Sequence, residues 1–255
     1  MHFSRRAWGW AAASALLSLS CLASPAFAAE AVTVYTYHNH PPFVLEAGKG
    51  LSYDLADYLT RKSKGASTFK IEVVSRAQLD QLLATPDFKG VVAWVAPEWF
   101  KDKDRTTYLW STGVMDDANV ILSSAKSRIE YKDPASLKGK QFGGIVGHKY
   151  SGIDDLVAAG AVKREDAEKE RNNLRKLDAG RIDATLLPRS TANYLLTEME
   201  LATKLYVAPT VQSSYTRHIL VPKKAPDLQR LLNEAVADMP RDGGWQSTLA
   251  KYGSK

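Results

Sequence analysis

Cysteine is almost absent from this 255-residue chain, which contains a single one, Cys21. A lone thiol forms no intramolecular disulfide and supplies no cysteine-based metal site. Cys21 also lies in an N-terminal segment that we expect to be removed. The remaining chain is long enough to be stabilised by burial of a hydrophobic core alone.

Long hydrophobic runs are scarce as well. The most apolar stretch, Ala7–Leu22, is interrupted by three serines and is a poor membrane span. Arg5 and Arg6 precede it, and Ala26-Phe27-Ala28 follows it as a cleavage signature. This order predicts a secretory signal peptide over residues 1–28, which leaves 227 of the 255 residues. We therefore expect a periplasmic protein.

No long run of one charge sign occurs. The chain has 34 basic and 28 acidic residues, and without Arg5 and Arg6 the formal net charge falls from +6 to +4. The charges are mixed along the sequence, a pattern that favours solubility and offers no basic arm for nucleic acid. We expect neither a nucleic-acid partner nor a cofactor.

The first part of the remaining chain alternates between strand and helix patterns. Strands are predicted at Val32–Tyr37, Phe69–Val74 and Gly90–Val95, and helices from a Ser52 cap to Gly65 and at Gln78–Leu83. This order indicates an α/β unit with parallel pairing.

A second set of elements follows. Strands are predicted at Asn119–Ser123, Gln141–Val146, Ile182–Leu187 and Lys204–Val207, and helices at Gly152–Ala159, Arg164–Leu177 and Thr191–Glu198. A strand at Tyr215–Val221 precedes a helix that begins at Pro226, and Gly243-Gly244 separates that helix from a last one. Strand-like segments near 118–124 and 213–221 thus join the two α/β sets, which predicts two lobes, a two-strand hinge and a cleft.

Four segments also match a known family in their order and spacing. They are VTVYTYHNHPPFVLEAGKGLSYDLADYLTRKSKG, PASLKGKQFGGIVGHKYSGIDDL, LDAGRIDATLLPRSTANYLL and DLQRLLNEAVADMPRDGGWQSTLAKYG. Together they resemble the family-3 periplasmic solute-binding proteins of the amino-acid type. The resemblance implies the α/β, two-lobed periplasmic-binding-protein fold of type II, with the second lobe inserted in the first. The first lobe would comprise residues 29–118 and 217–255, and the second lobe residues 119–216.

The loop Tyr37–Phe43 follows the first strand, and ligands of open α/β sheets lie beyond the carboxyl ends of strands. We expect Tyr37, His40 and Phe43 to line the cleft. Other interpretations remain open for this loop. His38 and His40 would bind a metal with His148, or act in catalysis, or belong to a loop without ligand contacts.

A second candidate patch lies between residues 94 and 111. In the resembling family, an arginine after a Thr/Ser-Pro-Glu stretch clamps the ligand's α-carboxylate, a task that suits the guanidinium fork. The arginine nearest that role here is Arg105, and the alternative is a solvated arginine in a charged loop. Trp94, Trp99 and Trp110 are candidates for the cleft wall or for the core.

The loop at 147–152 joins a strand to a helix, where backbone N–H groups bind anions well. Gly147, His148, Tyr150 and Ser151 are the candidates there, and the Ser151 hydroxyl either contacts ligand or caps the helix.

The sequence departs from the family pattern directly after the predicted strand Ile182–Leu187. By resemblance an aspartate that holds the α-ammonium is expected where this chain has Pro188. Arg189 follows it and either binds an anionic group or faces solvent.

The favoured hypothesis is a monomeric, non-enzymatic binding protein that closes on a small polar solute, an amino acid or related organic acid, and delivers it to an ABC permease. The alternatives are an enzyme of the same fold, resembling cyclohexadienyl-type dehydratases, and a sensor subunit that signals to a receptor. Glu98 and His40 are the candidate acid–base groups for the enzyme alternative.

Overall fold

The computed structural model describes residues 1–2 and 30–253. Apart from residues 1–2, the predicted signal peptide, with Cys21 and the Ala26–Ala28 signature, lies outside the described residues. Within the described chain, every helix is too short or too polar to cross a bilayer.

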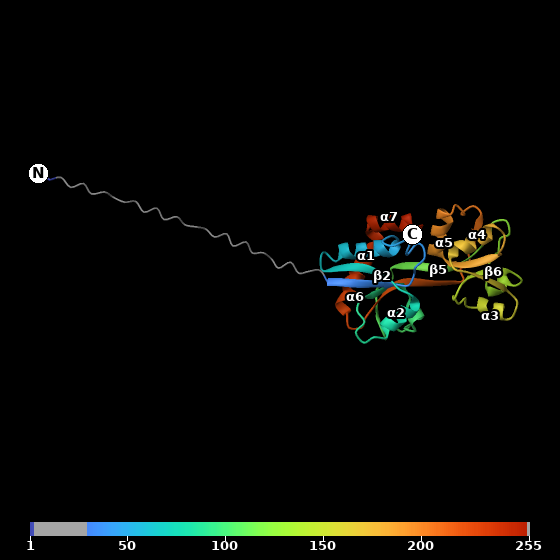
Figure 1. The fold of residues 1–255 in the computed structure, drawn as a ribbon, viewed down its shortest axis with the longest axis horizontal. Coiled ribbons are helices and arrows are strands. Elements are labelled where there is room, and N and C mark those ends of the chain that lie inside the picture. The colour runs from blue at the N-terminus through green and yellow to red at the C-terminus, as the bar shows by residue number, and fades with distance from the viewer. Residues whose placement is uncertain (3–29, 254–255) are drawn as a thin grey trace.

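The first lobe is built on a sheet with the strand order β2 (Ser67–Val73), β1 (Glu30–Thr36) and β3 (Val91–Val95), all parallel. Helices α1 (Leu51–Lys62) and α7 (Gly243–Lys251) lie on one side of it, and α2 (Arg76–Leu83) lies on the other (Figure 1). Helix α6 (Pro226–Asp238) packs against α1 in the same hydrophobic cluster. Short 3₁₀ turns span Pro97–Phe100 (η1) and Met239–Arg241 (η3), and β4 covers Leu109–Trp110.

The second lobe repeats this arrangement. Strands β6 (Gln141–Ile145), β7 (Lys163–Ala167) and β8 (Ala184–Pro188) are parallel, with β6 between the other two. The short strand β9 (Leu205–Val207) pairs with β5 (Met115–Ser124). Helices α4 (Glu170–Asp178) and α5 (Arg189–Glu198) cover one face, and α3 (Ile153–Ala158) with the 3₁₀ turn Pro134–Leu137 (η2) covers the other (Figure 1).

Two long strands connect the lobes. The chain leaves the first lobe along β5 (Met115–Ser124) and returns along β10 (Ser213–Val221). These strands are antiparallel, in a register from Ser213 opposite Asn119 to Arg217 opposite Met115. Beyond this stretch β10 pairs with β3, and β5 pairs with β8, so the hydrogen-bonded sheet runs through both lobes. The prediction of an inserted second lobe and a two-strand hinge is confirmed.

The predicted charged helix at Arg164–Leu177 is wrong in its first part. Lys163–Ala167 forms β7, an edge strand paired with β6, and the helix begins only at Glu170. Charged side chains suit an edge strand because they face solvent and discourage further strand pairing. Strand pairing with β6 therefore outweighs the local helical preference of this segment.

Ser52 does not cap α1. Gly50 is the N-cap residue, at φ 128°, and a Cβ there would lie 2.5 Å from the carbonyl oxygen of Phe43. The buried Ser52 hydroxyl instead accepts a hydrogen bond of 3.0 Å from Nε1 of Trp94. Trp94 has φ 69°, a conformation that L-residues rarely adopt, and its ring is fully buried at the end of β3. This hydrogen bond helps to fix the strand end from which the loop 96–105 departs.

We predict that Ser52→Ala lowers the free energy of unfolding by about 1–3 kcal/mol, because it leaves the buried indole N–H of Trp94 without a partner. Urea unfolding followed by far-UV circular dichroism measures the change. Ser214→Ala, at an exposed serine, is the matched control and should be near neutral. Equal stabilities of the two variants would contradict this role for Ser52.

Candidate functional site

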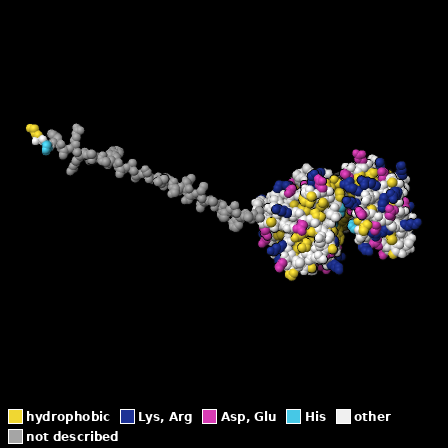
Figure 2. All heavy atoms as spheres, in the orientation of Figure 1, with side chains coloured by type: hydrophobic (Ala, Val, Ile, Leu, Met, Phe, Trp, Pro, Cys, Tyr) yellow, Lys and Arg dark blue, Asp and Glu magenta, His cyan; other side chains and the backbone are white. Residues whose placement is uncertain are grey.

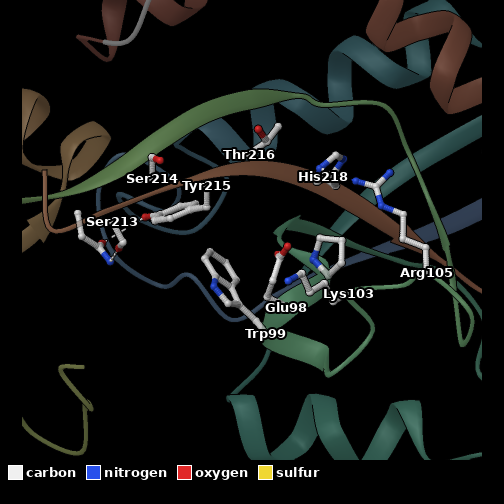
Figure 3. Close-up of a pocket in the computed structure, with 11 residues that line it drawn as sticks. Glu98, Trp99, Lys103, Arg105, Ser213, Ser214, Tyr215, Thr216 and His218 are labelled. Atoms are coloured by element: carbon white, nitrogen blue, oxygen red, sulfur yellow. Dashed lines mark hydrogen bonds between the residues drawn. The ribbon is translucent and has the colours of Figure 1, made fainter. Parts of the chain in front are cut away.

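A groove of about 480 Å³ lies where the first lobe meets the hinge. Its walls come from the η1 loop and from β10 (Figure 3). The lining residues are Pro97, Glu98, Trp99, Lys103, Arg105, Asn119, Ser213, Ser214, Tyr215, Thr216 and His218. Figure 2 shows the molecule hollowed between its two lobes, with histidine side chains at the junction.

One edge of β10 forms one side of the groove, and over Ser213–Thr216 this edge has no neighbouring strand in the described part of the chain. Residues Ser213–Thr216 pair with β5, whereas pairing with β3 on the other edge starts at His218. Backbone N–H and C=O groups alternate along such an edge, so a polar ligand finds donors and acceptors there.

Two aromatic rings meet at the groove wall. Trp99 of the η1 turn and Tyr215 of β10 have ring centroids 5.0 Å apart, in an edge-on arrangement. Both rings are partly exposed and both line the groove, as Figure 3 shows. They offer apolar, polarisable surface to a planar ligand.

Lys103 and Arg105 supply positive charge, and both are exposed. Nδ1 of His218 lies 2.8 Å from the carbonyl oxygen of Ser111, which can only accept, so Nδ1 carries the proton. Nε2 of His218 then has no proton, and its lone pair accepts a hydrogen bond from Nη2 of Arg105 at 3.4 Å. The remaining N–H groups of the exposed Arg105 guanidinium are available to an anion.

The loop that carries these cations is held by Asp102. Its carboxylate accepts hydrogen bonds from the backbone N–H groups of Thr106, Thr107 and Tyr108 and from Nε1 of Trp110, at 2.8–3.1 Å. Burial raises the pKa of Asp102, but these hydrogen bonds, that from Thr107 the largest, outweigh it and the pKa is lowered. The charged carboxylate therefore fixes the segment that follows Arg105.

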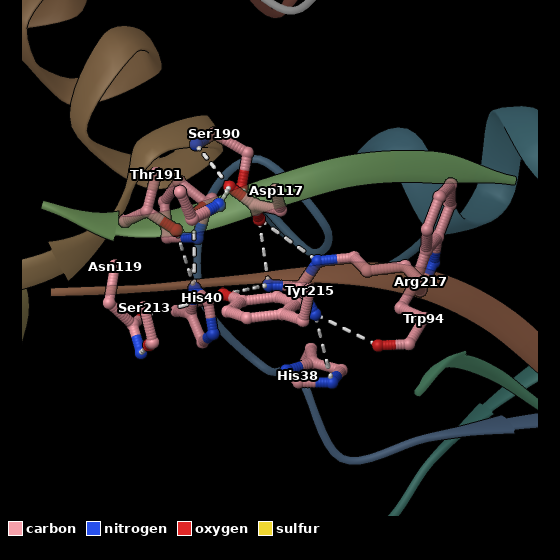
Figure 4. Close-up of polar contacts among 12 residues, drawn as sticks. His38, His40, Trp94, Asp117, Asn119, Ser190, Thr191, Ser213, Tyr215 and Arg217 are labelled. Carbon is pink, nitrogen blue, oxygen red and sulfur yellow. Dashed lines mark hydrogen bonds and ion pairs between the residues drawn. The ribbon is translucent and has the colours of Figure 1, made fainter. Parts of the chain in front are cut away.

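An ion pair lies beneath the groove, between the two hinge strands (Figure 4). Nε and Nη2 of Arg217 donate to Oδ2 of Asp117 at 3.0 and 2.9 Å, and both side chains are only 1% exposed. Arg217 also donates to the carbonyl oxygen of Trp94 at 2.8 Å. The Asp117 carboxylate accepts from the backbone N–H and the hydroxyl of Ser190 in α5, at 3.1 and 2.7 Å. The pair thus connects the first lobe, the hinge and the second lobe.

The loop Tyr37–Phe43 packs against this ion pair. His38 and Phe43 are buried, and Phe43 lies under the Arg217 guanidinium, 4.6 Å from ring centroid to Cζ. Nδ1 of His40 lies 3.2 Å from the Thr191 hydroxyl, a contact between the lobes. Tyr37 is partly buried with Arg76 over its ring. In the described part of the chain, no three or more His, Cys, Asp or Glu side chains are grouped to hold a metal ion.

Both histidines of this loop titrate below the usual range. Burial, and then the nearby positive charge of Arg217, hold the pKa of His38 well below 6.5. Burial also lowers the pKa of His40, although Glu170 opposes that shift. Both rings are therefore neutral near pH 7.

The second-lobe loop places three predicted residues at its surface and one in the core. Gly147, His148 and Ser151 are exposed. Tyr150 is buried, its hydroxyl oxygen accepts from the N–H of Ile145 at 2.9 Å, and burial raises its pKa to about 12. Arg164 supports the loop, because its Nη2 donates to the carbonyl oxygen of His148 at 3.0 Å. The residue that caps α3 is Gly152, so the capping alternative for Ser151 is wrong.

The predicted site residues thus fall into separate environments: the groove, the surroundings of the buried ion pair, the core of the first lobe and the surface of the second lobe. Trp99 and Arg105 line the groove, whereas Tyr37, His40 and Phe43 gather around the buried ion pair. Trp94 and Trp110 are buried in the first lobe, where each indole N–H has a protein acceptor. Arg189 is exposed at the start of α5, directly after Pro188.

Sequence reasoning missed Asp117, Arg217, Tyr215 and Lys103. Two of these carried a usable signal, because Arg217 interrupts one of the two segments expected to be connecting strands and Asp117 directly precedes the other. Charged residues in buried strands require a partner, and each strand supplies one of opposite sign.

Comparison with known proteins agrees with this architecture. No protein-family model and no curated protein sequence matches the chain. Solved structures do, among them the GluR0 ligand-binding core from Nostoc punctiforme in complex with (L)-glutamate, with a TM-score of 0.66, 16% identity and coverage of 88% of this chain and 100% of that one.

Two ancestral proteins have the same fold. One is an arginine-binding protein bound to arginine, with a TM-score of 0.65, 20% identity and coverage of 89% and 99%. The other is the amino acid-binding protein AncCDT-1, a precursor of cyclohexadienyl dehydratase, with a TM-score of 0.64, 17% identity and coverage of 88% and 96%. These likenesses confirm the two-lobed periplasmic-binding-protein fold inferred from the sequence.

The neutral histidines generate a pH prediction. The unfolded chain protonates His38 near pH 6.5 and the folded chain only at lower pH, so the unfolded state binds more protons in between. Stability should therefore fall as pH decreases from 7.5 to 5.5, by about 1 kcal/mol for His38 and by less for His40, whose pKa is lowered less.

His38→Gln should flatten this dependence by about that amount in urea unfolding at each pH. Asn39→Ala, an exposed neighbour without a titratable group, controls for disturbance of the loop. An unchanged pH slope in His38→Gln would contradict the buried neutral state of His38.

Proposed function

We propose that this chain is a periplasmic solute-binding protein that closes its lobes on a small polar solute, an amino acid or related organic acid, for delivery to an ABC importer. The observation that carries the proposal is the groove at the hinge, which combines two exposed cations, two aromatic rings and a strand edge that has no neighbouring strand among the described residues. The fold shared with proteins that bind arginine or glutamate supports it.

In this proposal Arg105 and Lys103 bind the anionic group of the solute. Trp99 directly follows Pro97-Glu98, the position at which the resembling family has its carboxylate-clamping arginine. Arg105 supplies the guanidinium from later in the same loop, and its αL backbone (φ 54°) is fixed by the N–H donated to the carbonyl oxygen of Asp102 at 2.8 Å. A planar solute group would lie along Trp99 and Tyr215.

The second lobe would complete the site on closure. Gly147, His148 and Ser151 form its exposed lip, and Arg189 adds a further exposed cation. Nε2 of Gln212, the residue before β10, donates to the carbonyl oxygen of Ser151 at 3.4 Å, which connects this loop of the second lobe to the hinge strand. We assign residues 29–118 and 217–255 to the first lobe and 119–216 to the second.

An enzymatic role is the second candidate, because one observation favours it. The exposed Glu98 carboxylate lines the same groove as the cations, and AncCDT-1 is the precursor of a dehydratase. Protonation of the departing hydroxyl by the Glu98 carboxylic acid, with loss of CO₂ from the substrate's carboxylate supplying the electron pair of the new C=C bond, would balance such an elimination of water. Turnover of prephenate-like substrates that is lost in Glu98→Gln would support this role over binding alone.

A thermal-shift screen of the mature chain against amino acids, organic acids and polyamines tests the binding proposal. A ligand of the folded state raises the melting temperature with its concentration, by the equivalent of about 2.7 kcal/mol at one hundred times its Kd. We expect small organic anions to do so.

The groove cations should be responsible for that shift. Lys103→Gln and Arg105→Gln should each weaken binding about tenfold or more, since each removes a charge-assisted hydrogen bond. Lys70→Gln, at an exposed lysine of β2, is the matched control and should bind like the parent. Binding that is equally strong in all three variants would contradict the proposed site.

A further inference from the structure

A closed set of interactions surrounds the guanidinium of Arg217. An arginine has five N–H donors. In Arg217 the Nε–H and one Nη2–H face Asp117, and the other Nη2–H faces the Tyr215 hydroxyl at 3.3 Å. The two Nη1–H groups face the carbonyl oxygen of Trp94 and Nε2 of His38, at 2.8 and 3.4 Å. Arg217 therefore has no donor left for a solute.

Three aromatic rings enclose the same group. Cζ of Arg217 lies 4.6, 5.1 and 5.5 Å from the ring centroids of Phe43, Tyr215 and Trp99. We call these three rings the aromatic cage. Rings at such distances attract a cation through their negative faces, and the attraction strengthens when water is excluded.

Both oxygens of the Asp117 carboxylate are likewise occupied by hydrogen-bond donors. Oδ2 of Asp117 accepts from Arg217 and from the Ser190 hydroxyl, and Oδ1 accepts from the N–H groups of Ala118 and Ser190. Cage, carboxylate and carbonyl oxygen together are the elements that recognise a guanidinium. Here the chain's own Arg217 side chain occupies them, and Figure 4 shows it beside the Asp117 carboxylate, the Trp94 carbonyl oxygen and the Tyr215 ring.

We propose that Arg217 is a specificity-determining residue, an internal ligand that fills a guanidinium site and thereby excludes arginine-like cations from the cleft. This inference rests on the proposed function, because it assigns the solute class of the same cleft. The ion pair cancels the charge of Asp117, so the cations Lys103 and Arg105 dominate the adjoining groove. Solutes that carry a carboxylate are therefore favoured. Guanidinium compounds are disfavoured, because Arg217 already occupies the aromatic cage and the positive charges of Lys103 and Arg105 repel them.

The test removes the internal ligand and supplies it again as a small molecule. Arg217→Ala leaves Cβ, and ethylguanidinium replaces the remaining atoms of the side chain. Because Trp99 and Tyr215 line both the groove and the cage, the compound can enter from the groove. N-ethylurea, a neutral molecule of similar shape, is the matched control compound.

In Arg217→Ala, millimolar ethylguanidinium should raise the melting temperature by about 3 °C or more at ten times its Kd, and ethylurea should not. Wild-type protein should respond neither to ethylguanidinium nor to arginine. A wild-type shift with either compound would overturn the proposal, as would equal effects of ethylguanidinium and ethylurea on the variant. If Arg217→Ala is recovered unfolded, its refolding yield from urea with each compound gives the same comparison.

This outcome is separable from the function itself. If ethylguanidinium stabilises Arg217→Ala but no organic anion raises the melting temperature of the wild type, the role of Arg217 as an internal ligand is supported and the proposed solute binding is contradicted. Anion binding without rescue would sustain the binding function and contradict the role of Arg217.

Discussion

The buried Arg217–Asp117 ion pair is the constraint on which the rest of the site depends. Removing two charges from water is costly, and such a pair is tolerated only when its hydrogen-bonding capacity is satisfied. That condition is met by groups from three parts of the molecule: the carbonyl oxygen of Trp94 and His38 in the first lobe, Tyr215 in the hinge, and Ser190 in the second lobe. The arrangement of the lobes at the hinge is thus linked to the geometry of one ion pair.

The groove is shaped by the same interaction. Arg217 lies under Trp99 and Tyr215, whose rings form the groove wall, while Asp102 ties down the loop that carries Lys103 and Arg105. The buried Asp117 carboxylate therefore holds Arg217 beneath the groove. The buried Asp102 carboxylate holds the backbone of the loop that presents Lys103 and Arg105 at the groove. The neutral state of His38 belongs to this scheme, because a charged imidazole beside Arg217 would add an unpaired positive charge in a buried place.

Much of the fold was predictable from the sequence, and much of the site was not. The strands and the two hinge crossings follow from short β-branched runs separated by glycine and by helical patterns, which are local signals. The error at Lys163–Ala167 arose because a charged edge strand resembles a surface helix until its partner strand is known. The Arg217–Asp117 pair joins residues 100 positions apart in an antiparallel register, and no local pattern specifies that register. Trp110 and Asp102 are only eight positions apart, but their contact depends on the conformation of the irregular loop between them, which no helix or strand period specifies.

A double-mutant cycle on the ion pair tests the central claim most directly. Arg217→Met and Asp117→Asn, each measured by urea unfolding, should cost about 3–5 kcal/mol because each leaves a buried charge without its partner. The double variant should cost clearly less than the sum of the two, since it removes both charges together. Costs that simply add would show that the two side chains do not act as a unit, and would contradict the account.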